Sequence, residues 1–170
     1  MQFEFNSEQM VSSSSLDGLI IIWKLKKLQI LERVNTFSIP VSVKSGSKQP
    51  HESTGVIDMV YIVVSQTIAC IDMDKKVTYI NLQTNLIEKQ LQAAYDGQLT
   101  AISLNELNHE IAVGDEAGEI KIFSNLDGKL LFLDQHAHAS PITSLCYSPD
   151  GKQLVSADCY GKLLIWNVNP

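Results

Sequence analysis

The segment Gly161-Lys162-Leu163-Leu164-Ile165-Trp166 decides the fold, because its pattern occurs four times in the 170 residues. In each copy an apolar run follows a turn and ends in a bulky anchor residue. The other copies are Gly118-Glu119-Ile120-Lys121-Ile122-Phe123, Lys75-Lys76-Val77-Thr78-Tyr79-Ile80 and Gly18-Leu19-Ile20-Ile21-Ile22-Trp23. The four anchors are 57, 43 and 43 residues apart in chain order. A period of about this length is the signature of a repeat architecture.

Further apolar runs surround each anchor at constant offsets. One run directly precedes the anchor segment, as Leu154-Val155-Ser156 does in the last copy. Another begins 24 residues before the anchor, at Ile142, Leu99 and Val56. A fourth run follows each of the first three anchors. Turn residues such as Asp127-Gly128 separate the runs, so the sequence predicts an all-β chain of four-stranded antiparallel units.

The units are expected at residues 1–33, 56–93, 94–135 and 136–170, with an inserted loop at 42–55. A β-sandwich would also fit alternating short strands. It would not explain a self-alignment with constant offsets, which favours four consecutive blades of a β-propeller. By this register we expect Met1 to lie at the first strand of its unit and the last unit to lack its outer strand.

The last unit resembles a WD repeat from His138-Ala139-Ser140-Pro141-Ile142 through Ser148-Pro149-Asp150-Gly151 to Ile165-Trp166-Asn167. The resemblance implies a non-catalytic scaffold that binds proteins, as part of a larger, usually seven-bladed ring. Further blades of the same chain or another subunit would complete that ring. It also suggests, by analogy, a structural component of a cytoskeletal or ciliary microtubule-associated complex.

The WD resemblance assigns a hydrogen-bonded group that holds each blade together. Matching positions offer one or more members of this group in the first, second and last units: Ser13, Asp17, Trp23, Asp74, His138, Ser156 and Trp166. In the last unit Tyr160 occupies the position where the family has Asp, so we expect no unit to keep the full set.

Composition excludes several classes of function. Residues 51–170 hold fifteen Asp and Glu against seven Lys and Arg, and Arg33 is the chain's one arginine. This charge disfavours nucleic acid, which clustered basic residues bind. No apolar run approaches the roughly 20 residues of a membrane helix, and no secretory signal is present. We therefore expect no membrane association and an intracellular, cytoplasmic location, with the cytoskeleton or a cilium as a narrower alternative.

The sequence contains no recognised catalytic, cofactor or metal motif. The strongest metal candidate is His136 and His138 with Cys146 and Cys159, but the repeat already gives His138 a structural role. Asp72, Asp74, Asp115 and Glu116 fall in equivalent turns, where solvated carboxylates are ordinary. We expect no cofactor, metal or small-molecule substrate. A propeller hydrolase is the rival class.

Two basic or flexible features are candidates for partner contacts. Lys24, Lys26 and Lys27 alternate with leucines in an expected outer strand, where solvated lysines commonly protect an edge. The inserted loop, residues 42–55, carries Lys44 and Lys48. It is either a tether between blades or a loop that binds a partner, since long loops on rigid scaffolds often carry function.

Overall fold

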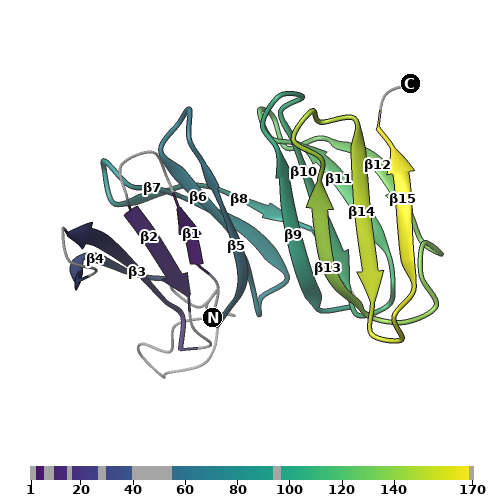
Figure 1. Ribbon diagram of the computed structural model, residues 1–170, viewed down its shortest axis with the longest axis horizontal. Coiled ribbons are helices and arrows are strands. Elements are labelled where there is room, and N and C mark those ends of the chain that lie inside the picture. Colours follow the sequence, from purple (N-terminus) through teal and green to yellow (C-terminus); the bar gives the residue numbers. More distant parts are fainter. Residues whose placement is uncertain are drawn as a thin grey trace, which may run out of the picture. The chain divides into compact units, whose positions relative to one another are not determined.

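The computed structural model describes residues 3–5, 10–14, 17–26, 30–39, 55–93 and 97–168. Side chains are described at 17–23, 36–39, 55–93 and 97–168. The described residues contain fifteen strands and no helix, arranged in four antiparallel sheets (Figure 1). The prediction of an all-β chain of consecutive propeller blades is confirmed.

Each sheet is formed by strands that follow one another in the chain. The first contains β1 (Phe3–Phe5), β2 (Met10–Ser14), β3 (Leu19–Lys26) and β4 (Ile30–Ser38). The second contains β5 (Val56–Ile62), β6 (Thr67–Asp72), β7 (Lys76–Asn81) and β8 (Leu86–Gln92). Strand β4 extends beyond residue 33, where the sequence placed the end of the first unit.

The third sheet contains β9 (Leu99–Asn105), β10 (Glu110–Asp115), β11 (Ile120–Ser124) and β12 (Leu130–Asp134). The last contains β13 (Ile142–Tyr147), β14 (Gln153–Asp158) and β15 (Leu163–Asn167), so that three strands are seen among the residues described there. The inserted loop lies outside the described residues except for Gly55.

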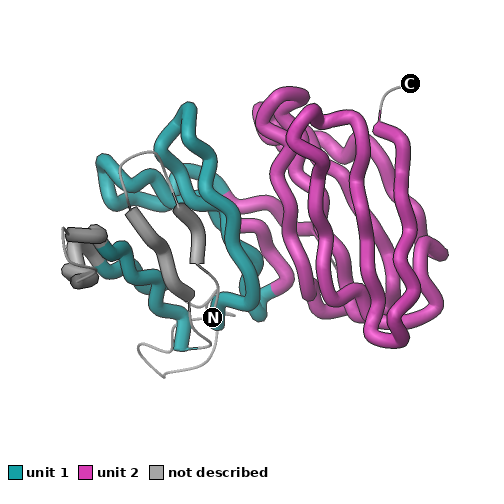
Figure 2. The backbone as a smooth tube through the Cα atoms, in the orientation of Figure 1, with its two compact units in different colours: residues 1–74, 78–89 teal, residues 75–77, 90–170 magenta. Residues whose placement is uncertain are grey.

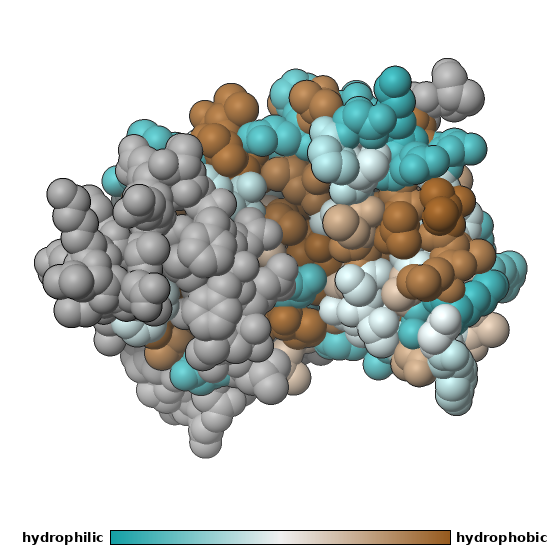
Figure 3. All heavy atoms as spheres, viewed as in Figure 1, coloured by the Kyte–Doolittle hydropathy of each residue, from teal (hydrophilic) through white to brown (hydrophobic). Residues whose placement is uncertain are grey.

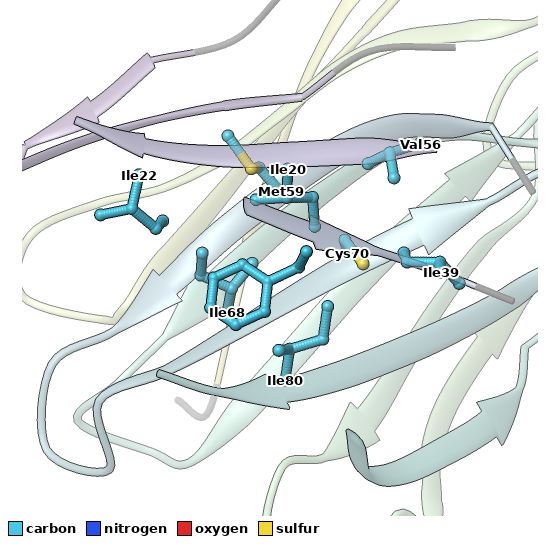
Figure 4. Packing of buried hydrophobic residues seen from close by; sticks show 9 residues of the cluster. Ile20, Ile22, Ile39, Val56, Met59, Ile68, Cys70 and Ile80 are labelled. Carbon is cyan, nitrogen blue, oxygen red and sulfur yellow. The ribbon is translucent and has the colours of Figure 1, made fainter. Parts of the chain in front are cut away.

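The chain divides into two compact units, shown in different colours in Figure 2. One holds residues 1–74 and 78–89, and the other holds residues 75–77 and 90–170. In the first unit, apolar side chains of β3 and β4 pack against those of β5, β6 and β7. Figure 4 shows this core, whose labelled members are Ile20, Ile22, Ile39, Val56, Met59, Ile68, Cys70 and Ile80.

The core of the second unit joins its two sheets. Its buried members are Ala101, Ala112, Ile120, Ile122, Ala137, Ile142, Leu145, Tyr147 and Leu154, with Trp166 and Val168 packed against them. Apart from Ala137 and Val168, these residues come from β9 to β11 and from β13 to β15, so the two sheets of this unit bury apolar side chains against each other. Apolar packing between neighbouring sheets is what holds a repeat architecture together.

A repeated β-bulge marks the start of three sheets. The pairing of the first two strands shifts between Val56 and Asp58 and between Ile142 and Ser144, and the third sheet shifts at Gly114/Asp115. In each case the residue opposite the bulge is an aspartate that ends the second strand. Bulges re-aim side chains. They bring these three carboxylates to equivalent places.

Candidate interaction surfaces and the network that supports them

A buried hydrogen-bond network ties the last sheet to the segment before it. The Trp166 indole Nε1–H donates to Ser156 Oγ at 2.8 Å, and Ser156 Oγ lies 2.7 Å from His138 Nε2. His138 Nδ1 lies 3.0 Å from Asp158 Oδ2. The contacts are satisfied together when Nδ1 carries the imidazole proton and the Ser156 hydroxyl donates to Nε2. The structure thus brings together three residues that the sequence singled out.

Asp158 supplies the carboxylate that the sequence analysis placed at position 160. The expectation that the last unit lacks this member was wrong, because the bulge at the start of β13 lets the aspartate at the end of β14 reach the histidine. Asp158 Oδ1 also accepts hydrogen bonds from the amides of Tyr160 and Lys162, at 3.0 and 2.9 Å. Burial alone would raise the pKa of Asp158, but the Lys162 amide, His138 and the Tyr160 amide hold it at about 2.

The same position carries an aspartate in three successive repeats, each eight residues before its anchor: Asp72, Asp115 and Asp158. All three are buried, with 0%, 2% and 7% of their surface exposed. The expectation that Asp72 and Asp115 lie in solvated turns was therefore wrong. Their 43-residue spacing was the signal that could have identified them.

Each carboxylate has a different side-chain partner. Thr78 Oγ1 donates to Asp72 at 3.0 Å, while Lys121 Nζ lies 3.3 Å from Asp115. Burial alone would lower the pKa of Lys121, but the hydrogen bond to Glu119 and the nearby negative charges raise it above its usual value. Thr78 and Lys121 both stand two residues before their anchors. The carboxylate therefore contacts a hydroxyl group in the second sheet, an ammonium group in the third and a histidine in the last.

The remaining predicted residues lie apart from this network. The exposed Asp17 accepts a hydrogen bond from the Leu19 amide at 3.1 Å. Trp23 and Asp74 are half-buried, and the backbone of Ser13 pairs with Ile21 while its side chain is not described. The side chains of the predicted partner-contact lysines are not described: Lys24, Lys26, Lys27, Lys44 and Lys48. The backbones of Lys24 and Lys26 lie in β3, which pairs with both β2 and β4, so the expectation that they belong to an outer strand was wrong.

The last sheet exposes an apolar face. Leu163 and Ile165 on β15 are each 67% exposed, although their counterparts one repeat earlier, Ile120 and Ile122, are 1% and 8% exposed. Figure 3 shows hydrophobic residues gathered on the side of the second unit that carries β15. Large exposed apolar patches mark surfaces that bind other proteins.

The described residues include no group of three or more His, Cys, Asp and Glu side chains that could hold a metal ion. His138 is engaged by Ser156 and Asp158 instead. Over the same part of the chain, no helix has the length and apolarity needed to cross a membrane.

Comparison with known proteins gives consistent matches. Residues 128–167 match the family model "WD domain, G-beta repeat". WD repeat-containing protein SL1-17 of Schistosoma mansoni is 26% identical over 164 residues, which cover 94% of this chain and 47% of that protein. Apoptotic protease-activating factor 1 of Homo sapiens is 43% identical over 65 residues, or 34% of this chain and 5% of that protein. The chain thus spans about half the length of the first relative and far less of the second.

Among solved structures, a chain in a crystal structure of the mitotic checkpoint complex superimposes with a TM-score of 0.74. The match covers 97% of this chain and 45% of that one, at 16% sequence identity. It supports the fold alone. WD-repeat relatives serve in general as non-catalytic interaction scaffolds. The repeat period, the four sheets and these matches show a β-propeller fold built from four consecutive blades, the last of which matches a WD repeat.

Proposed function

We propose that this chain is a non-catalytic scaffold within a multi-protein assembly, and that the open face of its last sheet is a protein-binding surface. The occupant of this face is a further blade of the same chain or of another subunit. The observation that carries the proposal is the contrast between Leu163 and Ile165, which are exposed, and Ile120 and Ile122, which are buried at the equivalent places.

The third sheet supplies the pattern for such a contact. Ile120 and Ile122 lie in the core that joins the third and last sheets. Burying a leucine or isoleucine side chain contributes about 1.5–3 kcal/mol. Leu163 and Ile165 offer a comparable gain to whatever covers them.

A pair of equivalent glycines supports the same interpretation. Gly118 and Gly161 occupy the same turn in successive repeats, with φ of 86° and 85°. The Gly118 carbonyl accepts a hydrogen bond from the His138 amide at 3.1 Å, and a Cβ atom at Gly118 would strike the carbonyl group of His138. Nothing lies within 4 Å of the corresponding Cβ position at Gly161. The last sheet thus has room at the place where its predecessor receives the next blade.

The proposal includes an intracellular, cytoplasmic location. Unpaired cysteines favour it, since small secreted domains commonly rely on disulfides. A cytoskeletal or ciliary assembly rests on analogy alone, and a propeller hydrolase has no observation in its favour among the described residues.

Hydroxyl-radical footprinting of the endogenous protein tests the proposal. Leu163, Ile165 and Tyr160 should be oxidised several-fold more slowly in the native species than in the isolated 170-residue chain. Leu107 and Leu126, which are 67% and 71% exposed, are internal references that should keep their rates. If Leu163, Ile165 and Tyr160 were oxidised at the same rate in both species, the open face would bind nothing and the proposal would fail.

A further inference from the structure

A groove runs between the third and last sheets of the second unit. Its volume is about 310 Å³. One side is formed by Ile122 of β11 and by Leu131 and Phe132 of β12, and the other by Trp166 of β15 and by Val168. All five are apolar, and both sheets belong to one compact unit. The groove is therefore a built feature of this pair of blades.

Strand β12 makes one rim of the groove unusually apolar. Four consecutive residues, Leu130 to Leu133, are 40–55% exposed. Among the described residues β12 pairs with β11 on one side alone, so its other edge keeps backbone groups available for hydrogen bonds. Exposed hydrophobic edge strands recruit extended chains, which add to the sheet by backbone pairing. The apolar side chains of β12 therefore offer contacts to an extended segment that lies in the groove.

A buried acid lies among these apolar residues. Glu110, at the start of β10, also lines the groove and is 8% exposed. Its Oε2 accepts a hydrogen bond from Asn105 Nδ2 at 3.2 Å, and no described residue forms an ion pair with it. Burial raises the pKa of Tyr147, and the negative charge of Glu110 raises it further. A buried carboxylate without a cation is costly, and a basic group entering the groove would relieve that cost.

The charge of the surrounding chain favours the same kind of ligand. Residues 90–170 contain ten Asp and Glu against four Lys. This excess attracts basic segments and repels acidic ones. An apolar segment without a basic residue would satisfy the rim but leave Glu110 unpaired.

We propose that this groove binds an extended peptide segment of a partner protein, in which one arginine stands between apolar residues. The arginine pairs with Glu110, and the apolar side chains contact Leu131, Phe132 and Trp166 on the two sides of the groove. Arginine suits the site better than lysine because its planar guanidinium is less strongly hydrated and forms two hydrogen bonds with a carboxylate. The inference rests on the proposed scaffold function and names a class of partner for it.

Three blocked pentapeptides test the proposal by titration into the ¹⁵N-labelled 170-residue chain. Their sequences are acetyl-Leu-Val-Arg-Val-Leu-amide and the same peptide with Gln or with Glu at the centre. The arginine peptide should shift the Trp166 indole signal and the β12 amide signals, and should bind at least five-fold more tightly than the glutamine peptide. The glutamate peptide should bind most weakly. The Trp23 indole signal is the internal reference.

Three variants locate the binding. Glu110→Gln keeps an acceptor for Asn105 and should abolish the preference for arginine over glutamine. Phe132→Ser changes an exposed rim residue and should weaken all three peptides. Leu107→Ser removes an equally apolar, exposed residue that does not line the groove, and should change nothing. Thermal melting confirms that each variant is folded.

Equal affinity for the arginine and glutamate peptides, or an arginine preference that persists in Glu110→Gln, would overturn the inference. So would an absence of Trp166 shifts with every peptide. These outcomes leave the scaffold proposal standing, because that proposal is judged from the protection of Leu163 and Ile165 on the open face of the last sheet. The peptide titrations can therefore reject the groove proposal without rejecting the scaffold proposal.

Discussion

The equivalent glycines Gly118 and Gly161 allow the contact between blades to be measured by difference. Both lie at positive φ, 86° and 85°, where an alanine is strained. Alanine in this left-handed region costs about 1–2 kcal/mol relative to glycine, and that cost applies at both positions. Gly161→Ala should therefore lower the free energy of unfolding by this cost alone.

Gly118→Ala adds a collision. Its Cβ would meet the backbone carbonyl of His138 and would lie 3.0 Å from the carbonyl oxygen of Ser140. Backbone atoms yield less readily than the end of a flexible side chain, so the segment that leads into the last sheet must move. Such overpacking costs about 1–3 kcal/mol. Gly118→Ala should therefore lower the free energy of unfolding by about 2–5 kcal/mol in total.

Urea unfolding of the two variants, followed by tryptophan fluorescence, gives the comparison. With a slope of about 2 kcal/mol per molar urea, the Gly118→Ala midpoint should fall about 0.5–1.5 M below the Gly161→Ala midpoint. Equal midpoints would refute the argument that the turn at Gly118 receives the next blade. A lower midpoint for Gly161→Ala would show that its surroundings are more crowded than the structure indicates.

Three further predictions concern the buried polar groups. Ser156→Ala removes the hydroxyl on which an indole and an imidazole nitrogen meet, and should cost about 2–4 kcal/mol in urea unfolding. The exposed control Ser144→Ala should stay within about 0.5 kcal/mol, and equal losses would contradict the network. Lys121→Met should cost about 1–3 kcal/mol because a buried carboxylate loses its cation but keeps its amide hydrogen bonds. Lys129→Met, in an exposed pair, should cost less than about 1 kcal/mol, and the reverse order would count against the burial argument. Asp158 has a folded-state pKa of about 2, below the usual value of about 4. It therefore stabilises the fold above pH 4 and loses this effect as the pH falls toward 2. The difference in Tm between the wild type and Asp158→Asn should shrink over that range, and a constant difference would be evidence against the assigned pKa.

The sheets could be predicted because their signals are local and periodic. Apolar runs, turn glycines and a 43-residue offset predict which segments form strands, and the strands of each sheet follow one another along the chain. The predicted end of the first unit, near residue 33, was too early, because the residues that follow lack a regular apolar pattern. In the structure strand β4 continues to Ser38. Backbone pairing with β3 extends the strand to Ser38, and this pairing cannot be read from the sequence pattern.

The network was predicted in part. His138, Ser156 and Trp166 were found from their positions in the repeat, but the acid was sought at position 160. A bulge changes which residue of β14 lies opposite Ile142, and the sequence pattern gives no sign of that shift. The alignment of Asp72, Asp115 and Asp158 at 43-residue intervals is visible in the sequence. Their burial is not, because aspartates next to turns are usually solvated, and only the structure shows these three to be buried.

The three buried carboxylates explain how degenerate repeats keep one fold. Asp115 and Asp158 each accept amide hydrogen bonds from residues two and four positions later, at 2.9–3.0 Å. These bonds depend on the turn and not on the identity of the turn residues. The side-chain donor that completes the set can then change from imidazole to ammonium without altering the backbone. Loss of the histidine and tryptophan of a WD repeat from a blade is therefore no sign that the blade is lost.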